Sequence, residues 1–280
     1  MLPASLLLLG ALHGNFARAG NPASDPLAVA HSHNDYEQRV PLFDALRAGF
    51  ESVEADVWVK GGEIVVSHLP FFNRGRLEDL YLRPLQERVD RMGSVHGDGR
   101  PFYLWIDIKE STPELTDALF LLLERYKMFT VFTDEEVVPG PVVAVLTGDE
   151  AAKARYADGH HVRRACRDSN RFRLFDPAAD RRWTWYALPW GEVVSWDGSG
   201  PGLTVAMSAL RALVLEVHRL GRRIRLYGVP EKAEAWAAAV RAGVDQVGTD
   251  RIDEFRAFLL ARGGNGTALG VSAALAESGH

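Results

Sequence analysis

The chain has 280 residues, of which 47% are hydrophobic and 25% charged, and this composition is typical of a globular protein with room for one large domain. A formal net charge of −5 gives no indication of a nucleic-acid surface, which is usually strongly basic. The single cysteine, Cys166, excludes an internal disulfide and any cysteine-based metal motif.

The two ends of the chain are expected to lie outside the domain. An apolar run at residues 6–12 and a small-x-small pattern at 17–19 resemble a secretory signal peptide over residues 1–19, although no Lys or Arg precedes the run. The alternative is a misassigned start. We therefore expect a secreted or periplasmic protein with a single domain over residues 27–262. The Gly-, Ala- and Ser-rich tail, residues 263–280, is expected to be disordered.

Between these ends, short apolar runs alternate with stretches of helical spacing. Strands are predicted at 27–31, 52–60, 63–68, 102–109, 142–146, 223–227 and 244–248. Helices are predicted at 41–49, 112–126, 149–156, 203–220, 231–241 and 252–261. Repeated strand–helix units favour a parallel sheet, and the length suits a closed (β/α)8 barrel, or TIM barrel. The alternative is a doubly wound open sheet, but no glycine-rich phosphate loop follows the first strand.

The strand at 52–60 carries the clearest functional signal. Glu54 and Asp56 lie two residues apart, so they share one face and are about 6.6 Å apart along the chain, at about 3.3 Å per residue. Two bare carboxylates on a buried face would repel each other, and a bound cation removes that repulsion. The alternative is a solvated strand face.

Other polar residues also lie at strand ends. His31 ends the first strand, Asp107 and Lys109 end the strand at 102–109, and Asp250 follows the last strand. In a barrel the catalytic groups lie at the C-terminal ends of the strands. Asp107 and Lys109 would share a face, either as a plain ion pair or as a third metal carboxylate beside a lysine that binds substrate phosphate.

The order of these motifs carries a family resemblance. The motifs are His31-Ser32-His33-Asn34, Glu54-x-Asp56, His68 and Asp107-x-Lys109. They resemble the superfamily of phosphatidylinositol-specific phospholipases C and glycerophosphodiester phosphodiesterases, which share an irregular TIM barrel. Residues 30–59 are especially similar to a branch related to the yeast altered-inheritance-of-mitochondria proteins, and residues 243–255 resemble the closing strand and helix of the diesterases. Residues 128–220 do not align.

The resemblance implies a metal-dependent phosphoric diester hydrolase with one Mg²⁺ or Ca²⁺. Its metal ligands would be Glu54, Asp56, Asp107 and, if the Ser-His-Asn motif is aligned, Asn34. Its catalytic residues would be His33 or His31 as base, His68 as acid and Lys109 as a fixed positive charge. Tyr227 and Asp250 would contact the substrate. Carboxylate oxygens suit Mg²⁺ and Ca²⁺, and imidazole titrates near neutral pH, so the chemistry agrees with these roles.

The substrate is expected to be a small phosphodiester or a phospholipid. Residues 69–72, Leu-Pro-Phe-Phe, follow His68 and could make transient membrane contact or pack as an ordinary loop. Four tryptophans fall in the unaligned region and could line a substrate pocket or belong to the core: Trp183, Trp185, Trp190 and Trp196.

Two other functions remain open. His31-x-His33 also resembles the amidohydrolase or polymerase-and-histidinol-phosphatase pattern, in which both histidines bind a transition metal. The further ligands that this would require are His160, His161, His218 and Asp250. The second alternative is a non-catalytic barrel that binds a phosphorylated ligand. The sequence gives no oligomeric state.

Overall fold

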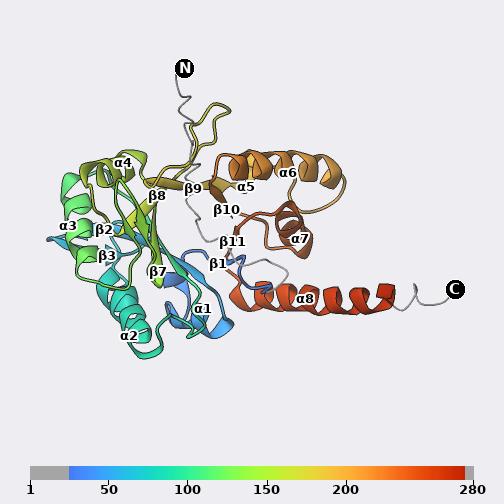
Figure 1. Cartoon of the computed structure of the whole chain (residues 1–280), viewed down its shortest axis with the longest axis horizontal. Helices are drawn as coiled ribbons and strands as arrows, with labels where there is room; N and C mark the ends of the chain where they lie inside the picture. Colours follow the sequence, from blue (N-terminus) through green and yellow to red (C-terminus); the bar gives the residue numbers. More distant parts are fainter. Residues whose placement is uncertain (1–24, 275–280) are drawn as a thin grey trace, which may run out of the picture.

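Eight parallel strands close into a barrel in the computed structural model, which describes residues 25–274, with side chains to residue 263 (Figure 1). In ring order the strands are β1 (Ala30–Ser32), β2 (Ser52–Lys60), β4 (Phe102–Ile108), β7 (Val142–Gly148), β8 (Ala165–Ser169), β9 (Trp183–Pro189), β10 (Arg223–Tyr227) and β11 (Gln246–Thr249). Because β1 pairs with both β11 and β2, the sheet has no open edge within the ring. The predicted TIM barrel is confirmed, and the open sheet is wrong.

Helices surround this ring. They are α1 (Phe43–Ala48), α2 (Arg83–Met92), α3 (Pro113–Glu124), α4 (Glu150–Gly159), α5 (Trp190–Val193), α6 (Leu203–Arg219), α7 (Ala233–Ala242) and α8 (Ile252–Ala274), with short helical turns at Asp35–Glu37 (η1) and Glu78–Leu82 (η2). As the sequence predicts, Thr112 caps α3 by accepting a hydrogen bond from the Leu115 amide at 3.3 Å. Pro113 occupies the first turn, where its missing N–H costs nothing.

Three features depart from the regular alternation of strands and helices: an extra strand, a small hairpin and a long loop. Strand β3 (Glu63–Val66) pairs antiparallel with β2 outside the ring, and β5 (Val131–Phe132) forms a separate hairpin with β6 (Val137–Val138). Between β8 and β9 the chain forms a loop, residues 170–182, in place of a helix. Neither β8 nor β9 was predicted from the sequence. Strand β8 reads ACRDS and has no apolar run, whereas β9 reads WTWYALP and does have one.

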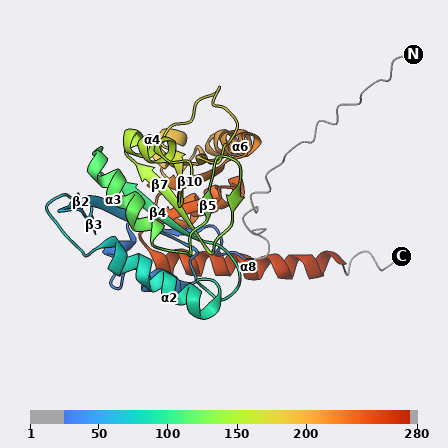
Figure 2. The ribbon, with the colours of Figure 1, turned by 60° about the vertical axis from the view of Figure 1, so that its left-hand side comes forward.

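The C-terminal helix is longer than predicted. Figure 2 shows α8 extending well beyond the barrel, with its backbone helical to Ala274. The disordered tail expected over residues 263–280 stays a prediction. Phe255 and Leu259 anchor the first turns of α8 in the core. The predicted signal peptide, residues 1–19, lies outside the described residues.

The barrel interior combines aromatic packing with buried charge. Tyr103, Trp105 and Trp185 pack edge to face, with ring centroids 5.2–5.5 Å apart, and fill the interior between β4 and β9. Trp185 is therefore a core residue, and Trp190 is also buried. This aromatic floor leaves the C-terminal ends of the strands for polar side chains. No helix in the described part of the chain is long and apolar enough to cross a membrane.

Candidate metal and catalytic site

Three carboxylates meet at the C-terminal ends of β2 and β4. Glu54 and Asp56 point to the barrel interior from β2, and the strand register places Asp56 directly beside Asp107 of β4. Ligand atoms of the three residues lie within 4.8 Å of one another. The structure thus brings together the three acids that the sequence predicts as metal ligands.

Each carboxylate has one oxygen held by the protein and one oxygen free. Glu54 Oε1 accepts a hydrogen bond from Arg225 at 2.9 Å. Asp56 Oδ2 and Asp107 Oδ2 both contact the Lys109 ammonium, at 2.9 and 2.7 Å. The other oxygens, Glu54 Oε2, Asp56 Oδ1 and Asp107 Oδ1, are buried and have no hydrogen-bond partner among the described side chains.

These three free oxygens fit a divalent cation. A buried acceptor without a partner costs roughly 1–3 kcal/mol, so three of them in one place call for a ligand that supplies positive charge. Hard oxygen ligands suit Mg²⁺ or Ca²⁺ better than zinc. The site thus has the donors for one cation, with Glu54, Asp56 and Asp107 as its ligands.

Glycine at position 148 makes room for Asp107. Gly148 ends the neighbouring strand β7 with φ +87°, a conformation that side chains rarely adopt. A Cβ atom at this position would overlap both Asp107 Oδ1 and the Ile108 carbonyl oxygen. The free oxygen of Asp107 therefore depends on this glycine.

Glu54 and Asp107 differ in their affinity for protons. Burial favours the neutral form of Glu54, but the charge of the Arg225 guanidinium outweighs burial and holds the pKa of Glu54 well below its usual range. Burial and the neighbouring charge of Glu54 raise the pKa of Asp107 to about 6, with Lys109 opposing the shift. Of these two carboxylates, Glu54 is therefore the one that stays ionised more firmly.

His33 has the geometry of an oriented base. Its Nδ1–H donates to Asp250 Oδ1 at 2.8 Å, so Nε2 faces the acids, 3.7 Å from Glu54 Oε2. Burial opposes protonation of His33, but the Asp250 hydrogen bond and the Glu54 charge outweigh burial and raise its pKa. Asp250 thus orients His33 through one carboxylate oxygen, and its expected contact with the substrate stays a prediction.

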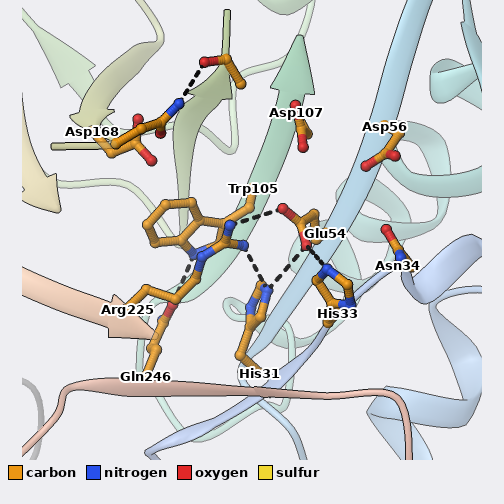
Figure 3. A network of polar contacts seen from close by, with 12 residues as sticks. His31, His33, Asn34, Glu54, Asp56, Trp105, Asp107, Asp168, Arg225 and Gln246 are labelled. Carbon is orange, nitrogen blue, oxygen red and sulfur yellow. Dashed lines mark hydrogen bonds and ion pairs between the residues drawn. The ribbon is translucent and has the colours of Figure 1, made fainter. Parts of the chain in front are cut away.

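His31 does not have the surroundings of a base. It is fully buried, and Arg225 donates to its Nε2 at 2.8 Å, so Nδ1 carries the proton and donates to Ser52 Oγ at 2.7 Å (Figure 3). Burial and the nearby Arg225 charge lower the pKa of His31 to about 4. Between the two candidates for the base, the structure favours His33 and gives His31 a supporting position beneath the acids.

His68 lies on the Asp56 side of the cluster. Its Nδ1–H donates to Asp56 Oδ2 at 3.0 Å, and 59% of its side chain is exposed, so its other ring nitrogen can reach a ligand from solvent. The Tyr36 hydroxyl donates to the same Asp56 oxygen at 2.8 Å. His33 and His68 thus flank the acids through different carboxylates, Glu54 and Asp56.

Two weaker candidates are adjacent to the site. Asn34 has a left-handed backbone conformation (φ 46°), and its Oδ1 lies 3.1 Å from the Tyr36 hydroxyl that binds Asp56. Tyr227 ends β10, half-buried, and packs against the interior aromatic cluster. Both are placed near the barrel mouth, as the sequence predicts.

The histidine-based metal site of the alternative interpretation is not formed. His31 Nε2 already accepts from Arg225, which leaves it no lone pair for a metal. The other candidates lie elsewhere: His160 stacks on Phe120, His161 pairs with Asp134, and His218 pairs with Asp245. Within the described residues, the acidic trio is the group of His, Cys, Asp and Glu side chains that converges as a metal site would require.

Sequence reasoning missed Arg225, which binds both Glu54 and His31 (Figure 3). The strand β10 reads RIRLY, and its alternation does place Arg225 on the same face as Tyr227. That pattern alone does not show whether this face is the interior. It also missed Tyr36, which gave no signal apart from its position two residues after Asn34.

Comparison with known proteins identifies the family and the fold type. Residues 24–164 match the model of the AIM6-like phosphodiesterase domain. The solved structure named "Putative glycerophosphoryl diester phosphodiesterase", from Silicibacter pomeroyi, has a TM-score of 0.53 at 15% identity and covers 85% of this chain and 94% of its own. The fold is therefore that of the glycerophosphodiester-phosphodiesterase type of TIM barrel.

Curated relatives place the chain more narrowly. The altered inheritance of mitochondria protein 6 of Lachancea thermotolerans is 26% identical over 80% of this chain and 64% of its own length. The homolog from Arthroderma benhamiae is 31% identical over 44% of the chain and 47% of its own length. The chain thus spans less than two thirds of these two relatives. It belongs to the AIM6-like phosphodiesterase domain family.

Proposed function

We propose that this protein is a metal-dependent phosphoric diester hydrolase that acts on a glycerophosphodiester or phospholipid-type substrate. One observation carries the proposal: three carboxylates each present a buried, free oxygen to one point, between two histidines. The fold shared with glycerophosphodiester phosphodiesterases supports the reaction class.

The reaction requires charge neutralisation, a base and an acid. A phosphodiester is an anion with a poor alkoxide leaving group. A divalent cation held by Glu54, Asp56 and Asp107 would neutralise the phosphoryl oxygens. Lys109 adds a positive charge at the same rim. Burial alone would lower the pKa of Lys109, but the charges of Asp107 and Asp56 outweigh burial and raise this pKa, so the Lys109 ammonium stays protonated.

Proton transfer falls to the two histidines. With Nδ1 bound to Asp250, His33 has Nε2 available to accept the proton of the attacking hydroxyl. His68, held by Asp56, would donate a proton to the leaving oxygen. The nucleophile would be water, or a neighbouring hydroxyl of the substrate, which gives a cyclic phosphate. Asn34 would complete the metal ligands, and Tyr227 would contact the substrate.

We also propose that the loop after His68 contacts lipid. Phe71 and Phe72 are 91% and 61% exposed at the edge of the site, although aromatic side chains usually bury their surface. Two such side chains expose far less area than the about 800 Å² that each partner of a stable protein complex usually buries, so they suit transient insertion into a lipid surface. Lys60, which binds the Phe72 carbonyl oxygen, adds a positive charge there.

A substrate screen tests the proposal. It would run from bis(p-nitrophenyl) phosphate through glycerophosphodiesters to lysophospholipids, each with Mg²⁺, Ca²⁺ or EDTA. We expect turnover of at least one alkyl diester with a divalent cation. A protein that binds these phosphates and turns none of them over would instead be a binding barrel.

A further inference from the structure

The chain holds a permanent positive charge directly beneath the acidic cluster. Arg225 extends from β10 into the barrel, where its Nη2 donates to Glu54 Oε1 at 2.9 Å and its Nη1 donates to His31 Nε2 at 2.8 Å. Its guanidinium lies over the Trp105 ring, 4.1 Å from the centroid. Figure 3 shows this group enclosed by Glu54, His31 and Trp105.

Each neighbour of Arg225 is itself fixed. Ser52 holds His31 through Nδ1, and Gln246 Oε1 accepts the Trp105 indole hydrogen bond at 2.8 Å. Four strands, β1, β2, β4 and β11, thus hold the guanidinium from different sides. Because the side chain is buried and an arginine stays charged, its charge cannot move away from Glu54.

The charge of Lys109, unlike that of Arg225, can move. Its ammonium bridges Asp56 and Asp107 at the rim, where it is partly exposed at the end of a flexible four-carbon chain. It can move aside when a cation enters between the two aspartates. The cluster therefore has one movable counter-charge and one fixed counter-charge.

Stability alone does not account for the buried arginine. A buried ion pair contributes little net stability compared with apolar packing. Here the cost is higher still, because Arg225 Nε is buried without a hydrogen-bond partner among the described side chains. Arg225 binds one Glu54 oxygen, Oε1, and leaves the other, Oε2, directed at the metal position.

We propose that Arg225 is a positioning residue of the metal site: a resident counter-ion that binds one Glu54 oxygen, leaves the other available, and holds the affinity for the divalent cation at a moderate level. The inference rests on the proposed metal-dependent function. Three carboxylates with two neighbouring cations carry one net negative charge. Without Arg225 the same site would carry two, and it would bind a divalent cation more tightly.

The test is calorimetric titration of the metal-stripped protein with Mg²⁺ and with Ca²⁺. We expect Arg225→Met to bind the cation about tenfold more tightly or better, since a unit charge a few Å from a ligand has been removed. Arg225→Lys retains the charge, and its affinity should stay within a few-fold of that of the unmodified chain. Both metal-free variants should unfold at a lower temperature.

Arg222 provides a matched control. It is also a buried arginine stacked on a tryptophan, Trp183, at 3.6 Å from the ring centroid, but it donates to backbone carbonyls of residues 177, 178 and 183 and to none of the three acids. Arg222→Met should lower the unfolding temperature without tightening the cation affinity. Equal tightening in both variants would overturn the proposal.

A second pair of variants covers the case in which Arg225→Met does not fold. Glu54→Gln removes a ligand and leaves Arg225 without its partner, so it should weaken cation binding strongly. Adding Arg225→Met to Glu54→Gln removes the unpaired charge and should recover part of that loss. No recovery in the double variant, or an unchanged or weaker affinity in Arg225→Met, overturns the inference while leaving the hydrolase proposal standing. Absence of cation binding and of turnover in the unmodified chain overturns both.

Discussion

At the scale of single residues, the proposed chemistry depends on how each carboxylate divides its two oxygens. Glu54, Asp56 and Asp107 each give one oxygen to a protein cation and leave the other free. His33 and His68 are held in the same manner, each with Nδ1 bound to a carboxylate and the other ring nitrogen directed away from it. In the proposed chemistry, the three carboxylates therefore bind the cation, and the two histidines transfer protons.

The role of His68 can be tested through the leaving group. As the acid, it matters for a poor alkoxide and much less for p-nitrophenolate, which leaves without a proton. His68→Ala should reduce turnover of alkyl diesters by about 10²–10⁴-fold and that of bis(p-nitrophenyl) phosphate distinctly less. Glu54→Ala should reduce both equally. Equal losses for His68→Ala would show that His68 is not the acid.

The role of Asp250 can be tested through pH. His33 must be neutral to act as a base, so activity rises as pH passes its pKa, which the Asp250 hydrogen bond helps to raise. Asp250→Asn keeps an acceptor but removes the charge, so the acidic limb of kcat/KM against pH should move to lower pH. Asp245→Asn, beside the remote His218, is the control. An acidic limb that stays in place for Asp250→Asn would contradict this pairing.

At the scale of elements, the register between neighbouring parallel strands brings the site residues together. Because β2 and β4 are parallel neighbours with Asp56 opposite Asp107, spacing within one strand and order between strands were enough to predict the acidic trio. The Arg225–His31 contact could not be predicted, since it joins strands 194 positions apart and depends on which face of β10 is interior. The helix expected after each strand fails at β8, where the loop 170–182 takes its place.

The loop after β3 provides a prediction of its own. If Phe71 and Phe72 contact lipid, the double change to serine should reduce binding to phospholipid vesicles by about tenfold or more, since burying one such side chain is worth roughly 1.5–3 kcal/mol. Turnover of soluble bis(p-nitrophenyl) phosphate should not change. Phe175→Ser, at a 93% exposed phenylalanine in the loop 170–182, is the matched control. Equal loss on vesicles and in solution would argue against lipid contact.

At the scale of the whole molecule, the two parts of the barrel contribute differently. The family match, residues 24–164, contains Glu54, Asp56 and Asp107 together with both histidines. The later strands add the groups that hold them, Arg225 on β10 and Asp250 after β11. The sequence was most informative about the first part and least informative about residues 128–220. Export of a chain that begins near residue 20 stays a prediction from the sequence.

The most direct measurement is turnover of an alkyl glycerophosphodiester before and after removal of metal. We expect EDTA to abolish activity and Mg²⁺ or Ca²⁺ to restore it in the unmodified chain. Glu54→Gln should show neither activity nor restoration, while Glu124→Gln, a carboxylate that pairs with Arg164 on the outside of the barrel, should behave like the unmodified chain. Activity that persists in EDTA, or that survives in Glu54→Gln, would contradict the metal-dependent hydrolase.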